Sequence, residues 1–232
     1  MEDPADNPIL RLFHVHKRFG PHKALIDISL DIHRNAFYFI TGPSGAGKTT
    51  LLKLLYLGET VSEGQILING VNLSRISRKQ IPFLRRDIGI IFQDFKLLPT
   101  KTVFENVSIV LEAAEKSGRF IKKKVASVLR MVGMEDRRDA FPPGLSGGEQ
   151  QRVAAARAIV NNPLIILADE PTGSLDPESA DIIIDILKKY HATGATVIIA
   201  THDRNLINEA DGGIIRLEKG QMLSEATVPN GP

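Results

Sequence analysis

The segment GPSGAGKT, from Gly42 to Thr49, constrains this chain more than any other part of its sequence. It matches the pattern G-x-x-x-x-G-K-[S/T] and stands between an apolar run, 37–41, and a helix expected over 50–57. Glycines let the backbone direct several N–H groups at one anion, and a helix N-terminus adds about half a positive charge. Lys48 adds a full charge, and Thr49 adds a hydroxyl that can bind Mg²⁺. The segment therefore predicts a nucleotide-phosphate site rather than an ordinary chain reversal.

Composition excludes several classes of protein. The chain has 232 residues, 43% of them hydrophobic, which is enough for a large core, and its net charge of +2 is too small to indicate nucleic-acid binding. Without cysteine it has no disulfides, thiol nucleophile or cysteine-bound metal, so any metal should be a hard ion bound by oxygen. No apolar run approaches the roughly 18 residues needed to cross a bilayer, and the acidic start does not resemble a signal peptide. We therefore expect a cytoplasmic protein.

The pattern of apolar residues predicts an α/β fold. Ile28, Leu30 and Ile32 alternate with polar residues, which indicates antiparallel strands with one solvated face near the N-terminus. Unbroken apolar runs are typical of parallel strands covered on both faces. Such runs occupy residues 37–40, 88–92, 164–168 and 197–200.

The region 102–159 shows mostly helical spacing, for example in Val125, Val128, Leu129 and Val132. We therefore expect a mainly parallel sheet with helices, an N-terminal antiparallel β subdomain, and an inserted α-helical subdomain at about 96–159. The folded domain is placed at 9–224. The ends, 1–8 and 225–232, are expected to be flexible.

Two further segments contain candidate functional residues. Asp169 and Glu170 end the apolar run of LIILADE, where carboxylates of an α/β sheet meet the ligand crevice and can hold Mg²⁺ or polarise water. In LSGGEQ, Ser146 and Glu149 have the spacing of a helix capping box. Two adjacent glycines are costly where only a cap is needed, so we expect a ligand phosphate to approach the bare backbone there.

Five motifs in order resemble the ATP-binding-cassette (ABC) ATPases: GPSGAGKTT, Gln93 in IIFQDF, LSGGEQ, LADEPTGSLD and His202 in ATHD. The resemblance covers about residues 10–224. In that family each nucleotide lies between two protomers. One protomer contributes the phosphate loop, here GPSGAGKTT, and the other contributes the signature helix, here the helix that begins in LSGGEQ. The resemblance therefore implies ATP hydrolysis with Mg²⁺ by a homodimer that has two sites.

The resemblance also implies roles for single residues. Phe19 corresponds to the aromatic residue that stacks on adenine, where the family more often has Tyr. Asp176 would cross the dimer interface. The implied catalytic residues are Glu170, His202, Gln93 and Lys48, and the implied metal ligands are Thr49, Gln93 and Asp169. The implied nucleotide contacts are Gly42, Pro43, Ser44, Gly45, Ala46, Gly47, Lys48, Thr49, Thr50, Ser146, Gly147 and Gly148.

Within the family, the stretches 81–107 and 148–178 and the segment ATHDRNLI are most similar to the branch that acts in bacterial cell division with the membrane protein FtsX. The similarity implies that ATP closes the dimer, an FtsX-like membrane subunit relays the movement, and peptidoglycan hydrolases outside are activated. The implied partners are this subunit and other divisome components, with the protein on the inner face of the cell membrane. Phe95, Leu97 and Leu98 are expected to contact the membrane subunit.

Three alternatives stay open. The chain could be the ATPase of a lipoprotein-release or MacB-type efflux system, which shares LADEPTG. A soluble cassette acting on DNA or ribosomes is a second, although it would carry coiled-coil insertions or two tandem cassettes. A non-hydrolysing dimerisation switch is the third, and Glu170 and His202 argue against it. The basic residues Arg75, Arg78, Lys79, Arg85 and Arg86 are interpreted as a solvated face and not as a nucleic-acid contact.

Overall fold

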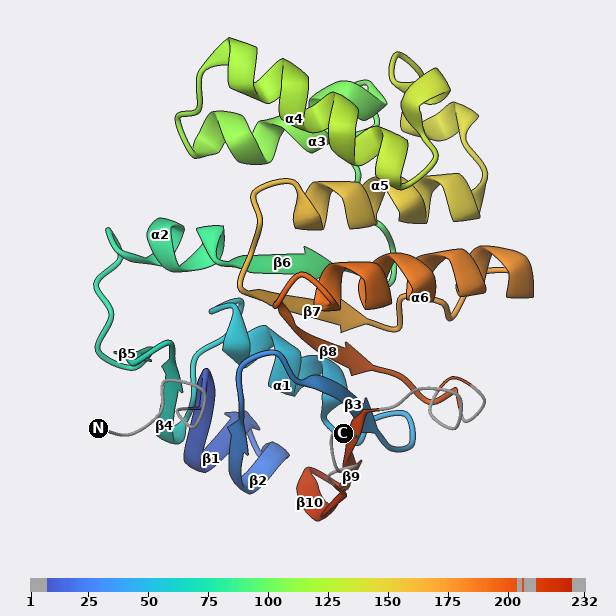
Figure 1. Ribbon diagram of the computed structural model, residues 1–232. Coiled ribbons are helices and arrows are strands. Elements are labelled where there is room, and N and C mark those ends of the chain that lie inside the picture. Colours follow the sequence, from blue (N-terminus) through green and yellow to red (C-terminus); the bar gives the residue numbers. More distant parts are fainter. Residues whose placement is uncertain (1–7, 204–205, 207–211, 227–232) are drawn as a thin grey trace. The chain divides into compact units, whose positions relative to one another are not determined.

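The computed structural model describes residues 8–203, 206 and 212–226 (Figure 1). Apart from Pro8 and residues 225–226, the ends that we expect to be flexible lie outside this range. The chain forms two compact units, one made of Met1–Phe83 with Thr196–Pro232 and the other of Leu84–Ala195.

The first unit contains an antiparallel sheet in the order β2-β1-β4-β5. Its strands are β1 (Leu10–Phe19), β2 (His22–Ile32), β4 (Glu63–Ile68) and β5 (Val71–Asn72). In β2 the side chains of Ile28, Leu30 and Ile32 are buried while Ser29 and Asp31 are exposed, which confirms the predicted alternation.

The same unit also contains the strands that surround β3 (Phe37–Thr41), whose bounds agree with the predicted run. β3 pairs in parallel with β8 (Thr196–Ala200) and β9 (Gly213–Glu218), and β10 (Gln221–Ala226) pairs antiparallel with β9. Helix α1 (Lys48–Leu55) follows β3 and buries four leucines. It begins two residues before the predicted start because Lys48 and Thr49 themselves form its first turn.

The second unit contains the parallel pair β6 (Ile88–Ile91) and β7 (Ile165–Asp169). The division between the units falls within the short α2 (Ile81–Arg86). The helices of the second unit are α3 (Val103–Ala113), α4 (Gly118–Met131), α5 (Gly147–Ile159) and α6 (Pro177–His191), with 3₁₀ turns at Glu135–Arg137 and Pro142–Gly144. Val125, Val128, Leu129 and Val132 are buried, as their spacing predicted. Helices α3 to α5 fall within 96–159, and the boundaries of that subdomain stay a prediction.

Helix α5 is the most deeply packed helix of this unit. It contacts α3, α4, α6 and β6, and the run Val153–Ala156 is fully buried. Small alanine side chains let neighbouring elements approach it from several sides at once. The position of the N-terminus of α5 is therefore set by packing along the whole helix. In the described part of the chain, no helix combines the length and the apolar character needed to cross a membrane.

Candidate functional site

The loop between β3 and α1 has the geometry of an anion site. Gly47, the N-cap of α1, has a φ of 107°, and a Cβ atom there would lie 2.7 Å from the carbonyl oxygen of Ala24. Only glycine fits this position, because both the backbone angle and the space exclude a side chain. The first N–H groups of a helix have no carbonyl partner inside it, and Gly47 brings no side chain to cap them. This end of α1 therefore favours a bound anion.

Lys48 lies over this loop. Its side chain is 7% exposed, and its Nζ atom donates to the carbonyl oxygens of Gly42 at 2.8 Å and Pro43 at 3.3 Å. Pro43, Ser44 and Gly45 are exposed at the turn of the loop, and so is Thr49 in the first turn of α1. The loop thus places an ammonium group and a helix N-terminus together, with its outer surface open to solvent.

Two further predicted residues of the first unit are exposed. Phe19, the last residue of β1, is 43% exposed, so it is not a core residue. Its ring lies against a cation, because the Nζ atom of Lys17 is 4.7 Å from the ring centroid. His202 follows Thr201, whose N–H donates to the carbonyl oxygen of Ile40 at 3.0 Å. Since β3 and β8 are parallel neighbours, the phosphate loop and His202 leave the same edge of the sheet.

In the second unit, Gln93, Asp169 and Glu170 leave one edge of the β6–β7 pair. Ile91 of β6 is paired with Ala168 of β7, so the segments after the two strands start at the same level. Glu170 has a φ of 45°, in the left-handed region that is uncommon for residues with a Cβ atom and recurs at functional sites. The structure therefore places this amide and these two carboxylates at one edge of the strand pair.

The signature segment begins α5 with the predicted capping box. The side chain of Ser146 accepts from the N–H of Glu149 at 3.2 Å, and the Glu149 carboxylate accepts from the N–H of Ser146 at 2.8 Å. A Cβ atom at Gly148 would lie 2.3 Å from Oγ of Ser179 on α6, whereas one at Gly147 would meet nothing closer than 3.9 Å. Intramolecular packing therefore explains Gly148, and the phosphate explanation is needed only for Gly147.

Sequence reasoning missed two contacts, of which one connects α5 with the segment after β7 and the other caps α6. Nε2 of the buried Gln151 donates to the carbonyl oxygen of Pro171, directly after Glu170, at 2.6 Å. Asp176 is the N-cap of α6, accepting from the N–H of Ser179 at 2.9 Å, and this bond lowers the pKa of Asp176 below its usual value. Asp176 thus has a structural role in addition to the one that the resemblance implies. Neither contact has a local sequence signal beyond the spacing of a cap.

The capping box makes a testable contribution to stability. The N–H of Ser146 lowers the pKa of Glu149 below its usual 4.5, so the charged carboxylate stabilises the folded state above that pH. We expect Glu149→Gln to lower the free energy of unfolding by about 0.5 kcal/mol at pH 7. This difference should shrink as the pH falls below 4.5 through the folded-state pKa. Urea unfolding between pH 7 and pH 3.5 measures it, with Glu115→Gln as the exposed control. A difference independent of pH would contradict the assignment.

Comparison with known proteins places these features in a family. The model of the ABC transporter family matches residues 25–173. The chain is 48% identical over 203 residues, 88% of its length and 89% of the relative's, to the cell division ATP-binding protein FtsE of Bacillus subtilis. This chain belongs to the FtsE family of ABC ATPases. FtsE of Escherichia coli K12 is 43% identical over 92% of this chain and 97% of its own length.

A solved structure agrees with this assignment. The dimeric ATP-binding cassette MJ0796, in a post-hydrolysis state bound to ADP and Pi, superposes with a TM-score of 0.88 at 36% identity. The match covers 96% of this chain and the whole of that one. The predicted ABC-type α/β fold is therefore confirmed, and this member of the FtsE family is an ATPase. The alternative of a non-hydrolysing switch is not supported.

Proposed function

We propose that the chain is the ATP-hydrolysing subunit of a cell-division membrane complex of the FtsE–FtsX type. The observation that carries the proposal is the phosphate loop, with Lys48 folded over it, in a chain that aligns with FtsE proteins over most of its length. The efflux and lipoprotein-release alternatives are not favoured, because relatives that are 41–48% identical over most of this chain are FtsE proteins.

The residues of the first unit hold ATP. Phe19 stacks on the adenine with its exposed ring, and the loop of residues 42–50 wraps the phosphates. Lys48 neutralises phosphate charge at the N-terminus of α1, which attracts anions by itself. His202 hydrogen-bonds the γ-phosphate. These roles follow from the family resemblance, and the exposure of Phe19, Thr49 and His202 is compatible with them.

Hydrolysis depends on Glu170, Gln93 and Asp169 of the second unit and on Thr49 of the first. Glu170 polarises the attacking water, because a carboxylate at a strand end can accept its proton. Thr49, Gln93 and Asp169 offer hydroxyl, amide and carboxylate oxygens, which are the ligands that Mg²⁺ prefers, so this donor set fits the ion. When bound, Mg²⁺ neutralises the charge that develops on the phosphates during transfer.

The active form is a homodimer. Ser146 and Gly147 are exposed at the N-terminus of α5, where a second anion can approach the backbone. This end binds the nucleotide held by the other protomer, and Asp176 lies at the dimer contact. Dimeric cassettes are known among the structural relatives.

The membrane subunit binds beside Gln93. Leu98 is 39% exposed, and Phe95 and Leu97 are partly exposed on the same loop. A cavity of about 240 Å³ lies next to it in the same unit. Its lining combines apolar and basic side chains, among them Phe92, Ile90, Val110, Arg85, Lys96 and Arg157. The protein is then held at the inner face of the membrane by this contact.

Leu98→Asp should abolish co-purification with an FtsX-like membrane subunit while leaving ATP binding and the melting temperature close to those of the wild type. A charge on an exposed apolar contact disrupts binding but leaves the fold intact, since the side chain of Leu98 is not in the core. Leu97→Asp should act in the same direction. Met131→Asp is the matched control, because Met131 is a 50% exposed apolar residue at the end of α4.

Retained co-purification of both leucine variants would place the docking surface elsewhere. Loss of the folded state in a thermal melt would instead show that these leucines belong to the core. Loss of binding by Met131→Asp as well would mean that the assay reports charge and not the docking site.

A further inference from the structure

The loop after Gln93 has an unfavourable backbone conformation. Phe95 and Lys96 have φ angles of 56° and 51°, so two successive residues with side chains lie in the left-handed region. The turn that ends at Phe95 is closed by the N–H of this residue, which donates to the carbonyl oxygen of Phe92 at 3.3 Å. Such strain persists only where the surroundings hold it, and it recurs at functional sites.

Arg157 of α5 holds this turn. Its Nη1 atom donates to the carbonyl oxygen of Lys96 at 2.6 Å, and its Nη2 atom donates to that of Phe95 at 2.7 Å. The guanidinium therefore binds two successive strained carbonyls with one planar fork, a geometry that lysine cannot reproduce. The bonded residues are 61 and 62 positions apart in the sequence.

Among the described residues, the guanidinium of Arg157 bonds only to these two carbonyl oxygens. No described carboxylate lies within ion-pair distance of it, and burial lowers the pKa of its guanidinium. Arginine stays protonated in proteins nevertheless. Burying a cation that only backbone carbonyls compensate costs free energy, and packing at the surface does not require it.

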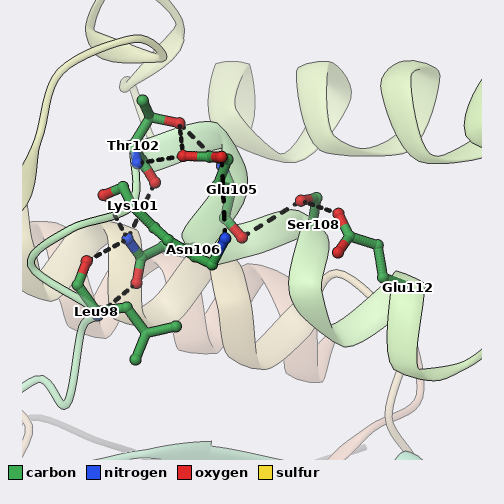
Figure 2. A network of polar contacts seen from close by, with 7 residues as sticks. All are labelled: Leu98, Lys101, Thr102, Glu105, Asn106, Ser108 and Glu112. Carbon is green, nitrogen blue, oxygen red and sulfur yellow. Dashed lines mark hydrogen bonds and ion pairs between the residues drawn. The ribbon is translucent and has the colours of Figure 1, made fainter.

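The far end of the same loop is fixed by a buried amide (Figure 2). Asn106 of α3 is fully buried, and its Nδ2 atom donates to the carbonyl oxygens of Leu98, Lys101 and Thr102 at 3.0–3.1 Å. Its Oδ1 atom accepts from the N–H of Leu98 at 2.7 Å. Asn106 therefore fixes residues 98–102, and the position of the segment nearest Gln93 depends on Arg157.

We infer that Arg157 is a positioning residue for Gln93. By binding the carbonyls of Phe95 and Lys96, it holds the Gln93 amide in place and makes the loop move together with α5, the helix that begins at Ser146. The inference rests on the proposed role of Gln93 at Mg²⁺ and the attacking water. It adds a connection between that amide and the signature helix that no sequence motif indicates.

A double-mutant cycle on the full-length chain tests the inference. Arg157→Gln should lower kcat by about tenfold to a hundredfold, the effect of a small misplacement of a catalytic group. Nucleotide affinity measured in EDTA should stay unchanged. With Mn²⁺ as the probe and a non-hydrolysable ATP analogue, electron paramagnetic resonance should show weaker metal binding. In the Gln93→Ala background, Arg157→Gln should have no further effect on either quantity. Arg119→Gln, at an exposed arginine of α4, is the matched control.

The outcomes separate the inference from the proposed function. Wild-type hydrolysis by Gln93→Ala would overturn the role of Gln93 and the inference with it. An impaired Gln93→Ala variant in which Arg157→Gln lowers kcat by the same factor as before would overturn the inference alone. If Arg157→Gln melts at a much lower temperature, Arg157→Lys decides, because it keeps the charge and loses the fork. Wild-type kcat and Mn²⁺ affinity in Arg157→Lys would overturn the inference, and defects in both would support it.

Discussion

Glu170→Gln should reduce ATP hydrolysis by about 10²–10⁴-fold while ATP binding persists. The amide keeps the size of the side chain but cannot accept a proton from water, and about 3–5 kcal/mol of barrier is restored. The substitution also removes a negative charge that would face the γ-phosphate. ATP-bound dimers should therefore accumulate, which size-exclusion chromatography with Mg-ATP and a phosphate-release assay measure together.

The matched control for this variant is Glu178→Gln. Glu178 is an exposed carboxylate in the first turn of α6, in the same unit as Glu170. The Glu178→Gln variant should hydrolyse ATP at the wild-type rate. Near-normal hydrolysis by Glu170→Gln would remove Glu170 from the role of general base, even if dimers formed.

Lys48→Ala and Ser146→Arg should fail at different steps. Lys48→Ala removes a charged donor to the phosphates, so nucleotide affinity of the protomer should fall by about 10–100-fold, the equivalent of 1.5–3 kcal/mol. Ser146→Arg should leave that affinity unchanged and prevent dimer closure, because a large side chain at the exposed start of α5 blocks approach of the partner's nucleotide. Fluorescent-nucleotide titration measures the first effect, and chromatography in the Glu170→Gln background measures the second.

Ser146→Ala is the control for the second variant, since it removes the cap without adding bulk. It should lower the stability of the chain by about 1 kcal/mol and still permit closure. Equal loss of protomer affinity in Lys48→Ala and Ser146→Arg would contradict binding of one nucleotide by two protomers.

Local patterns predicted much of this fold because its elements have strong local signals. The strand 37–41, the alternation in β2 and the cap at Ser146 each depend on residues that are neighbours in sequence. The start of α1 was placed two residues late because the motif residues Lys48 and Thr49 belong to the helix itself.

What the sequence could not show depends on contacts between distant segments. The clash that excludes a side chain at Gly148 comes from Ser179, 31 positions away, so the two glycines looked alike. Arg157 has the pattern of an ordinary helix residue, and its function follows only from where α5 lies beside the loop after Gln93. Packing between elements determines these features, and periodicity carries no information about them.

The surroundings of Phe19 have a thermodynamic consequence for the proposed stacking of adenine on its ring. Lys17 is itself held, since its Nζ atom donates to the carboxylate of Glu59 and to the carbonyl oxygen of Thr60, each at 2.9 Å. The ammonium is 4.7 Å from the ring centroid, so it restricts the rotamers of Phe19 before any ligand arrives. A flat base that stacks on this ring then loses less side-chain entropy than it would on a freely rotating one. In the proposed site, residues that do not contact the base would thus contribute to the affinity for it.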